Sequence, residues 1–312
     1  MTISKSTLGV ILTLAFVVLE SAQFVFFGGL FQKMSPYLFG FLVFGVMTLV
    51  FVGGTILFQR EQFNIAISRP RELLAVNLGA VVTFTAYLTS VQLVEPAITY
   101  TISSGTMPIA AYVFYRFGMR EGEPMRNSLE AAGNLIIFLG ITFLAAITVL
   151  GWTGFVRSGQ WSAALGVLLA VIDGVFFTLI LVYSQRMNKS GVGPSAVLGL
   201  RLPIYVMATG FFVYLDFEPS QPMAVPELAY YVVIGFLLTV PPLYLLQKAV
   251  PMISTLTLSA LTALGPFVVF SLQLYEGRVD YSTATLIGLS IYIVGAILAA
   301  VGAVRGASMS GA

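Results

Sequence analysis

The sequence predicts an all-α, polytopic membrane protein with ten transmembrane helices arranged as two inverted five-helix repeats. Three observations support this prediction: an apolar composition, a series of long apolar runs, and an internal repeat. The chain of 312 residues is 58% hydrophobic and only 9% charged, and its mean hydropathy is +0.96. A soluble domain carries about 25% charged residues, so this composition is typical of a chain embedded in a bilayer.

The apolar runs are each long enough to cross a membrane as a helix. A helix rises about 1.5 Å per residue and the hydrocarbon core is about 30 Å thick, so about 20 apolar residues suffice. Proline, glycine and charged residues interrupt the runs, as expected at helix ends. Strands of a β-barrel would alternate apolar and polar residues, and these runs do not. The predicted spans are 7–31, 36–58, 73–93, 96–114, 128–150, 161–184, 194–215, 227–247, 251–274 and 282–304.

The positive charges predict the orientation of these spans. Eleven of the 15 Lys and Arg residues lie at the amino terminus, after even-numbered spans or in the carboxyl tail, and three lie on the opposite side. Cytoplasmic loops carry the excess of Lys and Arg, so both termini are expected in the cytoplasm. We expect lipid as the surroundings of the protein.

The stretch 95–122 recurs in altered form as 250–277. A repeated register of this length indicates two related halves, at 1–155 and 156–312. Five spans per half turn the second half upside down relative to the first, which places a substrate site near the bilayer midplane. A shift of 155 residues aligns Gln92 with Gln247, Pro96 with Pro251, Glu121 and Gly122 with Glu276 and Gly277, Gly133 with Gly288, and Gly140 with Gly295.

Two carboxylates lie near the middle of their spans, at equivalent positions of the two halves. They are Glu20 and Asp173. A charge at this depth costs about 2.5–3.5 kcal/mol on insertion scales, unless it faces a cavity, finds a partner or is protonated. We interpret the pair as lining a polar pathway, where it binds a substrate ammonium or exchanges a proton. The alternative is that neighbouring polar side chains hold each acid and it serves only helix packing.

Arg201 is the other charge within a span. It could pair with Asp173, or it could bind a substrate carboxylate through two parallel hydrogen bonds. Alternatively, its side chain extends to the nearby membrane surface. The equivalent region of the first half carries no charge, so the repeat supports no shared role.

Hydroxyl and amide side chains are concentrated in the third, fourth, eighth and ninth spans. Such groups face another helix or water, because unpaired hydroxyls in lipid are costly. A cavity lined by them would suit a small amphipathic solute with an aromatic part. For a single Tyr the alternative is an interfacial anchor, and for a single Ser or Thr a helix–helix hydrogen bond. The predicted substrate-binding set is Glu20, Gln23, Tyr87, Tyr100, Ser103, Ser104, Asp173, Arg201, Tyr244 and Ser259.

Prolines and glycines predict the shapes and contacts of the helices. Pro108 and Pro266 lie inside the fourth and ninth spans, where each is expected to kink its helix. Small residues recurring on one face allow two helix backbones to approach closely. We therefore expect the fifth and tenth spans to pack through this face or to form a homodimer through it. Its residues are Gly133, Gly140, Gly288 and Gly295.

Several kinds of chemistry are disfavoured by composition. The chain has no Cys and no His. Thiol catalysis and imidazole proton relays therefore lack their reactive groups, and common transition-metal sites lack their usual ligands. We expect no metal, no cofactor and no enzymatic activity. Basic residues sit at segment ends and form no patch, so nucleic acid is not an expected partner.

At these positions the chain resembles the EamA-type branch of the drug/metabolite transporter superfamily. The resemblance rests on an acidic residue followed by glycines 12 and 19 residues later, in each half. It implies a ten-helix secondary transporter with cytoplasmic termini and a central cavity, similar to bacterial aromatic amino acid exporters. The family often has an Arg in the second helix of each repeat, and only Arg201 fits. The residues are Glu121, Gly133 and Gly140, then Glu276, Gly288 and Gly295.

The predicted function is export of small amphipathic metabolites, with aromatic amino acids favoured, by alternating access at the midplane. Proton coupling and facilitated diffusion are both open. Three alternatives remain: an exporter of lipophilic cations with the same fold, a passive channel, and a membrane-embedded enzyme.

Overall fold

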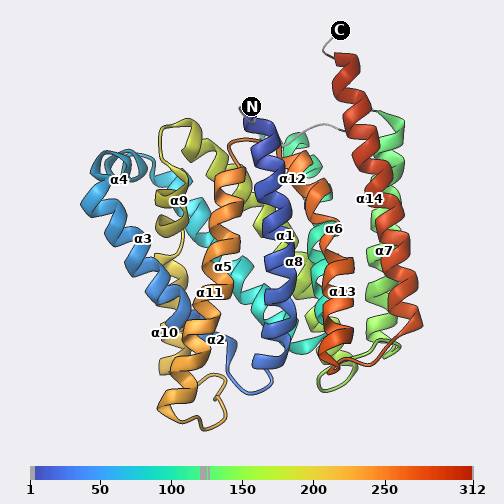
Figure 1. The fold of residues 1–312 in the computed structure, drawn as a ribbon, viewed down its shortest axis with the longest axis horizontal. Coiled ribbons are helices and arrows are strands. Elements are labelled where there is room, and N and C mark those ends of the chain that lie inside the picture. The colour runs from blue at the N-terminus through green and yellow to red at the C-terminus, as the bar shows by residue number, and fades with distance from the viewer. Residues whose placement is uncertain (1–3, 120–124, 126, 311–312) are drawn as a thin grey trace.

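The computed structural model describes residues 4–119, 125 and 127–310. This part of the chain is helical and without strands; its β-structure is a single isolated bridge between Val94 and Val156. Figure 1 shows the helices side by side in one bundle, with both chain ends at the same end of it. We call that end the terminal end and the other the distal end.

The helix boundaries agree with the proline and cap signals of the sequence. Ser4 and Asn127 cap their helices by accepting a hydrogen bond from a backbone N–H in the first turn. Proline lacks a backbone N–H, but at the start of a helix no hydrogen bond is lost, because the N–H groups of the first turn have no acceptor within the helix. The helices that begin with proline are α2, α5, α6, α9 and α10, and α11 and α13 carry it at their second residue.

The helices of the first half are α1 (Lys5–Leu30), α2 (Pro36–Phe39), α3 (Gly45–Phe58), α4 (Arg60–Ile67), α5 (Pro70–Leu93), α6 (Pro96–Arg116) and α7 (Ser128–Val149). Those of the second half are α8 (Gln160–Lys189), α9 (Pro194–Leu200), α10 (Pro203–Tyr214), α11 (Val225–Ala249), α12 (Thr255–Thr262), α13 (Gly265–Glu276) and α14 (Thr283–Ser310). A π-helical turn, η1 (Gly40–Phe44), joins α2 to α3.

Eight of these helical segments are long and apolar enough to cross a membrane. Their outward faces carry large apolar side chains, such as Leu49 and Phe58 on α3, which are 77% and 85% exposed. Water would make such surfaces costly, whereas lipid tails accommodate them. The protein is therefore a multi-pass membrane protein.

The two predicted proline kinks have different outcomes. α6 continues through Pro108 as one helix. At Pro266 the ninth span is interrupted by a full break in place of the predicted kink: α12 ends at Thr262, and Pro266 lies in the first turn of α13. The chain thus breaks the helix just before the proline, where the missing N–H has least effect. A further break separates α9 from α10 at Arg201 and Leu202, before Pro203.

The predicted glycine face is used within the chain. A Cβ on Gly133 of α7 would lie 2.2 Å from the backbone N of Ala299 on α14, and one on Gly140 would lie 3.0 Å from that of Tyr292. On α14, Gly295 meets the backbone of α7 and Gly288 meets Leu144. These glycines bring α7 and α14 into backbone contact (Figure 1). A second copy could therefore reach only the other faces of the two helices.

The closest helix pairs join the two halves of the sequence. α5 and α6 pack along α8, α1 packs along α11 and α13, and α7 packs along α14. Residues 1–155 and 156–312 therefore share their core. The main cluster of buried apolar side chains runs through both, from Phe24 and Phe84 to Tyr205 and Tyr292.

Candidate functional site

A cavity lies in the middle of the bundle, between helices of both halves. Its enclosed volume is about 40 Å³, and the empty space including its mouth is about 540 Å³. A volume of 40 Å³ has room for a few water molecules. A larger solute requires the helices to move apart. The lining residues are Glu20, Gln23, Phe24, Thr83, Phe84, Tyr87, Tyr100, Ser103, Ser104, Met107, Asp173, Phe177, Leu243 and Thr262.

Both intramembrane carboxylates face this cavity. Asp173 on α8 is 5% exposed, and its Oδ2 accepts a hydrogen bond of 2.6 Å from Ser103 on α6. Glu20 on α1 is partly buried and close enough to Asp173 for the two charges to repel each other. Neither carboxylate forms an ion pair of 4 Å or less with a described residue. Two carboxylates without a basic partner thus face one cavity in the described part of the chain.

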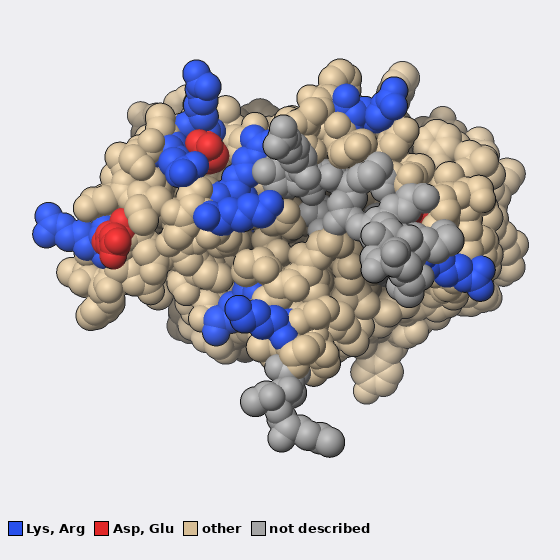
Figure 2. All heavy atoms as spheres, turned by 90° about the horizontal axis from the view of Figure 1, so that it is seen from above, with Lys and Arg blue, Asp and Glu red and all other residues tan. Residues whose placement is uncertain are grey.

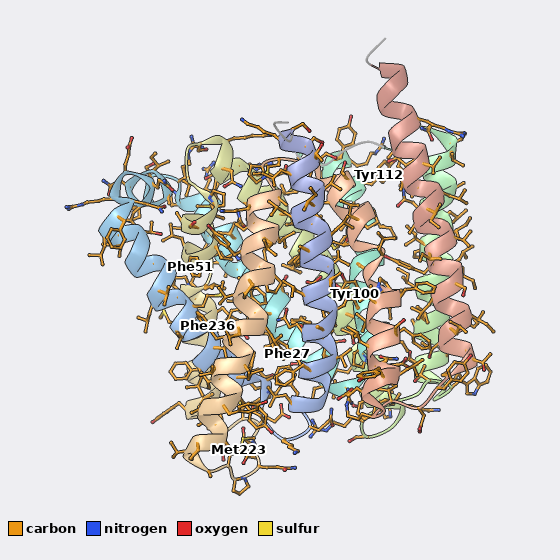
Figure 3. The ribbon with its side chains drawn as sticks, in the orientation of Figure 1. Phe27, Phe51, Tyr100, Tyr112, Met223 and Phe236 are labelled. Carbon is orange, nitrogen blue, oxygen red and sulfur yellow. The ribbon has the colours of Figure 1, made fainter. Side chains whose placement is uncertain are left out.

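Small residues bring the acids and the tyrosines to this place. A Cβ on Gly174 would lie 2.3 Å from the carbonyl oxygen of Ser103, so α6 and α8 are in backbone contact beside Asp173. Gly265, at the start of α13, lies against the ring of Tyr100 and would clash with it as alanine. Figure 3 places Tyr100 in the middle of the bundle. The hydrogen bond between Ser103 and Asp173 depends on this close approach.

Three hydroxyl groups of the cavity wall have no hydrogen-bond partner in the described part of the protein. They belong to Thr83, Tyr87 and Tyr100. The Tyr100 hydroxyl faces the Glu20 carboxylate without a hydrogen bond of normal geometry. These hydroxyls are therefore available to a polar group that enters the cavity.

Aromatic rings form the other part of the wall. Phe24 packs between Tyr87 and Tyr100, with ring centroids 4.6 and 4.7 Å away. Such a group offers edges and faces to an aromatic ligand. The sequence analysis did not single out the apolar members of the wall, because an apolar residue in a span gives no signal of facing a cavity. They are Phe24, Phe84, Met107, Phe177 and Leu243.

Seven of the ten predicted substrate-binding residues line the cavity, and three are elsewhere or undescribed. Arg201 is fully buried behind the wall, with its guanidinium 5.9 Å from the ring of Phe84. Among the described residues its side chain donates a hydrogen bond to Gln247 and does not pair with Asp173. Tyr244 lies away from the cavity, under the ammonium of Lys248. The Ser259 side chain falls outside the described residues, as does Glu121.

A polar network closes the bundle at its distal end. Glu95, at the start of α6, is fully buried and accepts hydrogen bonds from Gln273, Thr285 and the backbone N–H of Gly154. Burial raises the pKa of Glu95 above its ordinary value of 4.5, although these hydrogen bonds oppose the shift. This role of Glu95 was not predicted, although an acid directly before Pro96, at the start of a span, is a sequence signal for it.

A second group of contacts at the distal end holds the loop between α10 and α11. Glu218 accepts a 2.6 Å hydrogen bond from Gln92 and lies 3.7 Å from Arg157. The backbone N–H of Ser35 donates to Ser220. These contacts link the loop to the ends of α1 and α5. Polar contacts thus hold this loop against the rest of the distal end.

An apolar cluster closes the cavity toward the terminal end. Phe16 and Val17 on α1 lie one turn before Glu20, and Leu246 on α11 lies one turn after Leu243. With the cavity residues Met107 and Phe177 they form one buried cluster. Its other core members are Leu181, Val250 and Leu258. The cavity is therefore flanked by a polar closure on one side and an apolar closure on the other.

Comparison with known proteins shows the fold alone. No family model matches the chain, and no curated protein matches it. The fold is one already seen in solved structures, 25 of whose chains match. One of them, described only as "Crystal structure of protein", has a TM-score of 0.65 and 19% identity, over 96% of this chain and 99% of that chain. The described residues contain no cluster of three or more metal-ligating side chains.

Proposed function

We propose that the protein is a secondary transporter of small amphipathic metabolites, with aromatic amino acids as the favoured substrates, and that it belongs to the EamA-type drug/metabolite transporters. One observation carries the proposal. A cavity in the middle of the bundle combines two carboxylates, three unpaired hydroxyls and a group of aromatic rings. A carboxylate suits the substrate ammonium, and the rings suit its aromatic side chain.

The proposed topology has ten crossings, with an inverted second half. Two further crossings are added to the eight apolar spans. One is α6, and the other is the broken pair of α12 and α13, which together are long enough to cross a bilayer. Figure 2 shows Lys and Arg side chains gathered on the face seen from above, which is the terminal end. By the positive-inside rule this end lies in the cytoplasm. We propose a bacterial inner membrane as the location, with export as the direction.

In the proposed mechanism the two closures open alternately. Parting of the apolar cluster admits substrate from the cytoplasm to the acids. The cluster then closes over it, and the polar contacts around Glu95 and Glu218 separate to release it. Binding in the middle with one closure open at a time is how a carrier differs from a channel.

The proposal is tested with purified protein in liposomes. We expect saturable flux of tryptophan or phenylalanine above that of protein-free liposomes. Asp173→Asn should lower this flux at least about tenfold, because an ion pair with the substrate ammonium is lost. The variant should keep its unfolding temperature, since the asparagine still accepts from Ser103. Flux at the protein-free level for the unmodified protein would refute the substrate assignment.

A second candidate is an exporter of lipophilic cations. It is favoured by the absence of any positively charged side chain among the residues that line the cavity. Competition between such a cation and phenylalanine separates the two: the cation should displace phenylalanine only weakly if amino acids are the substrates. Single-channel conductance in a planar bilayer would indicate a passive channel instead.

A further inference from the structure

Arg201 is a buried cation with spare hydrogen-bond donors. Its side chain is fully buried, and its Nη1 donates to Oε1 of Gln247 on α11 at 3.3 Å. Its Nε and Nη2 have no partner in the described part of the chain, and neither has Nε2 of Gln247. A guanidinium keeps its charge in proteins, so this group is expected to find an anion or another acceptor.

The surrounding structure offers no internal anion. Arg201 forms no ion pair of 4 Å or less with a described carboxylate, and the acid predicted as its partner, Asp173, accepts from Ser103. Asn77 already binds both sides of the break between α9 and α10, through the carbonyl of Leu200 and the N–H of Ile204. The buried side-chain atoms of Arg201 and Gln247 that lack a partner are therefore all donors.

These donors suit a carboxylate. A guanidinium presents parallel N–H groups that match the two oxygens of a carboxylate, and the amide of Gln247 adds a further N–H. α10, of 12 residues, begins at Pro203, and the positive end of its dipole also favours an anion.

One aromatic ring separates these donors from the cavity. Phe84 lines the cavity, and the guanidinium carbon of Arg201 lies 5.9 Å from the centre of its ring. Phe44 and Tyr205 hold the ring by contacts at 4.7 and 5.5 Å between centroids. Phe84 thus belongs both to the cavity wall and to the surroundings of Arg201.

We propose that Arg201 and Gln247 form the carboxylate subsite of the transporter, reached when Phe84 turns aside. The inference rests on the proposed function and makes it more specific. The substrate then carries a carboxylate, which binds at Arg201 and Gln247 while the rest of the molecule lies in the cavity. An amine without a carboxylate leaves the guanidinium unpaired and binds weakly.

The test compares phenylalanine with phenethylamine, which lacks only the carboxylate. Calorimetric titration of the purified protein should give phenylalanine an affinity at least about tenfold higher. Arg201→Gln should weaken phenylalanine binding by a similar factor and leave phenethylamine unchanged. As a matched control, Arg278→Gln removes another arginine with unpaired nitrogens and should change the two ligands alike.

A second variant covers the case in which Arg201→Gln does not fold. Gln247→Glu keeps the size of the side chain and supplies a carboxylate beside the guanidinium. We expect it to fold with an unfolding temperature at or above that of the unmodified protein. It should lose the preference for phenylalanine, because the internal carboxylate occupies the subsite.

The outcomes separate the inference from the proposed function. Binding of neither ligand by the unmodified protein would overturn both. Equal affinity for phenylalanine and phenethylamine, or an equal loss of both in Arg201→Gln, would overturn the carboxylate subsite and leave the transporter proposal standing. Stabilisation by chloride that disappears in Arg201→Gln, without any preference for phenylalanine, would reassign the site to an inorganic anion.

Discussion

Gly174 determines how closely α6 and α8 approach beside Asp173. Any side chain at this position would meet the carbonyl oxygen of Ser103, and the hydroxyl of Ser103 would move away from the carboxylate that it now reaches at 2.6 Å. The Asp173 carboxylate is therefore held by the Ser103 hydroxyl, and this contact requires the absence of a Cβ at Gly174. The remaining oxygen of Asp173 is left for a ligand.

Glu20 is the residue at which proton coupling is tested. It is a partly buried acid next to a second acid, an arrangement in which protonation relieves repulsion. We expect an imposed pH gradient to drive phenylalanine flux in liposomes, and Glu20→Gln to respond to the phenylalanine gradient alone. Glu61→Gln, which changes an exposed acid on α4, should respond as the unmodified protein does. An undiminished response in Glu20→Gln would remove this role.

We expect the buried carboxyl group of Glu95 to make the stability of the protein depend on pH. Because burial raises its pKa above 4.5 in the folded protein, folding favours the protonated form. Its stabilising contribution is complete below pH 4.5 and is lost as the pH rises through the raised pKa. Unfolding temperatures measured across this range should fall less in Glu95→Gln than in the unmodified protein. Glu227→Gln, at an exposed position, should leave the slope unchanged; equal slopes in all three would contradict the prediction.

At the scale of elements, backbone proximity explains why α7 and α14 form a pair. Both helices carry glycines at the points of contact, and each glycine faces the backbone or a side chain of the other helix. Helices in lipid gain little from apolar burial, so such close contacts supply much of their association.

Two glycine substitutions test this contact. Gly133→Ala places a Cβ within 2.2 Å of the backbone of Ala299, and overpacking of this kind costs about 1–3 kcal/mol. Gly53→Ala, in α3, meets nothing within 4 Å and should stabilise by about 0.5–1 kcal/mol through helix propensity. Chemical unfolding in micelles measures both. The prediction is wrong if the two substitutions have the same sign.

At the scale of the whole molecule, alternating access requires the distal closure to open. Ser35 and Ser220 lie on opposite sides of it, with the Ser35 N–H donating to the Ser220 hydroxyl at 2.9 Å. The chain has no cysteine of its own, so a pair introduced at these positions reacts alone. Cross-linking the pair should reduce flux to the protein-free level, and reduction should restore it. Each single cysteine variant serves as a control, and full flux in the cross-linked protein would exclude opening at this place.

The sequence by itself determined the all-helical membrane class and much of the cavity. Apolar runs and proline positions act locally, so they predicted helix ends such as those at Pro70 and Pro96. Glu20 and Asp173 were predictable because a carboxylate within a span is costly anywhere except at a cavity or a partner. Their contact with the same cavity as Tyr87 and Tyr100 agrees with that reasoning.

Only the tertiary structure decided which groups face one another. The sequence pattern around an apolar residue such as Phe84 is the same whether the side chain faces lipid, another helix or a cavity. Its position beside Arg201 was therefore not predictable from the sequence. The hydrogen-bond partner of the Arg201 guanidinium is Gln247 on α11, a residue far away in the sequence. The bonds of Glu95 join residues far apart in the chain. Such pairings are set by the packing of all helices together, which local patterns do not encode.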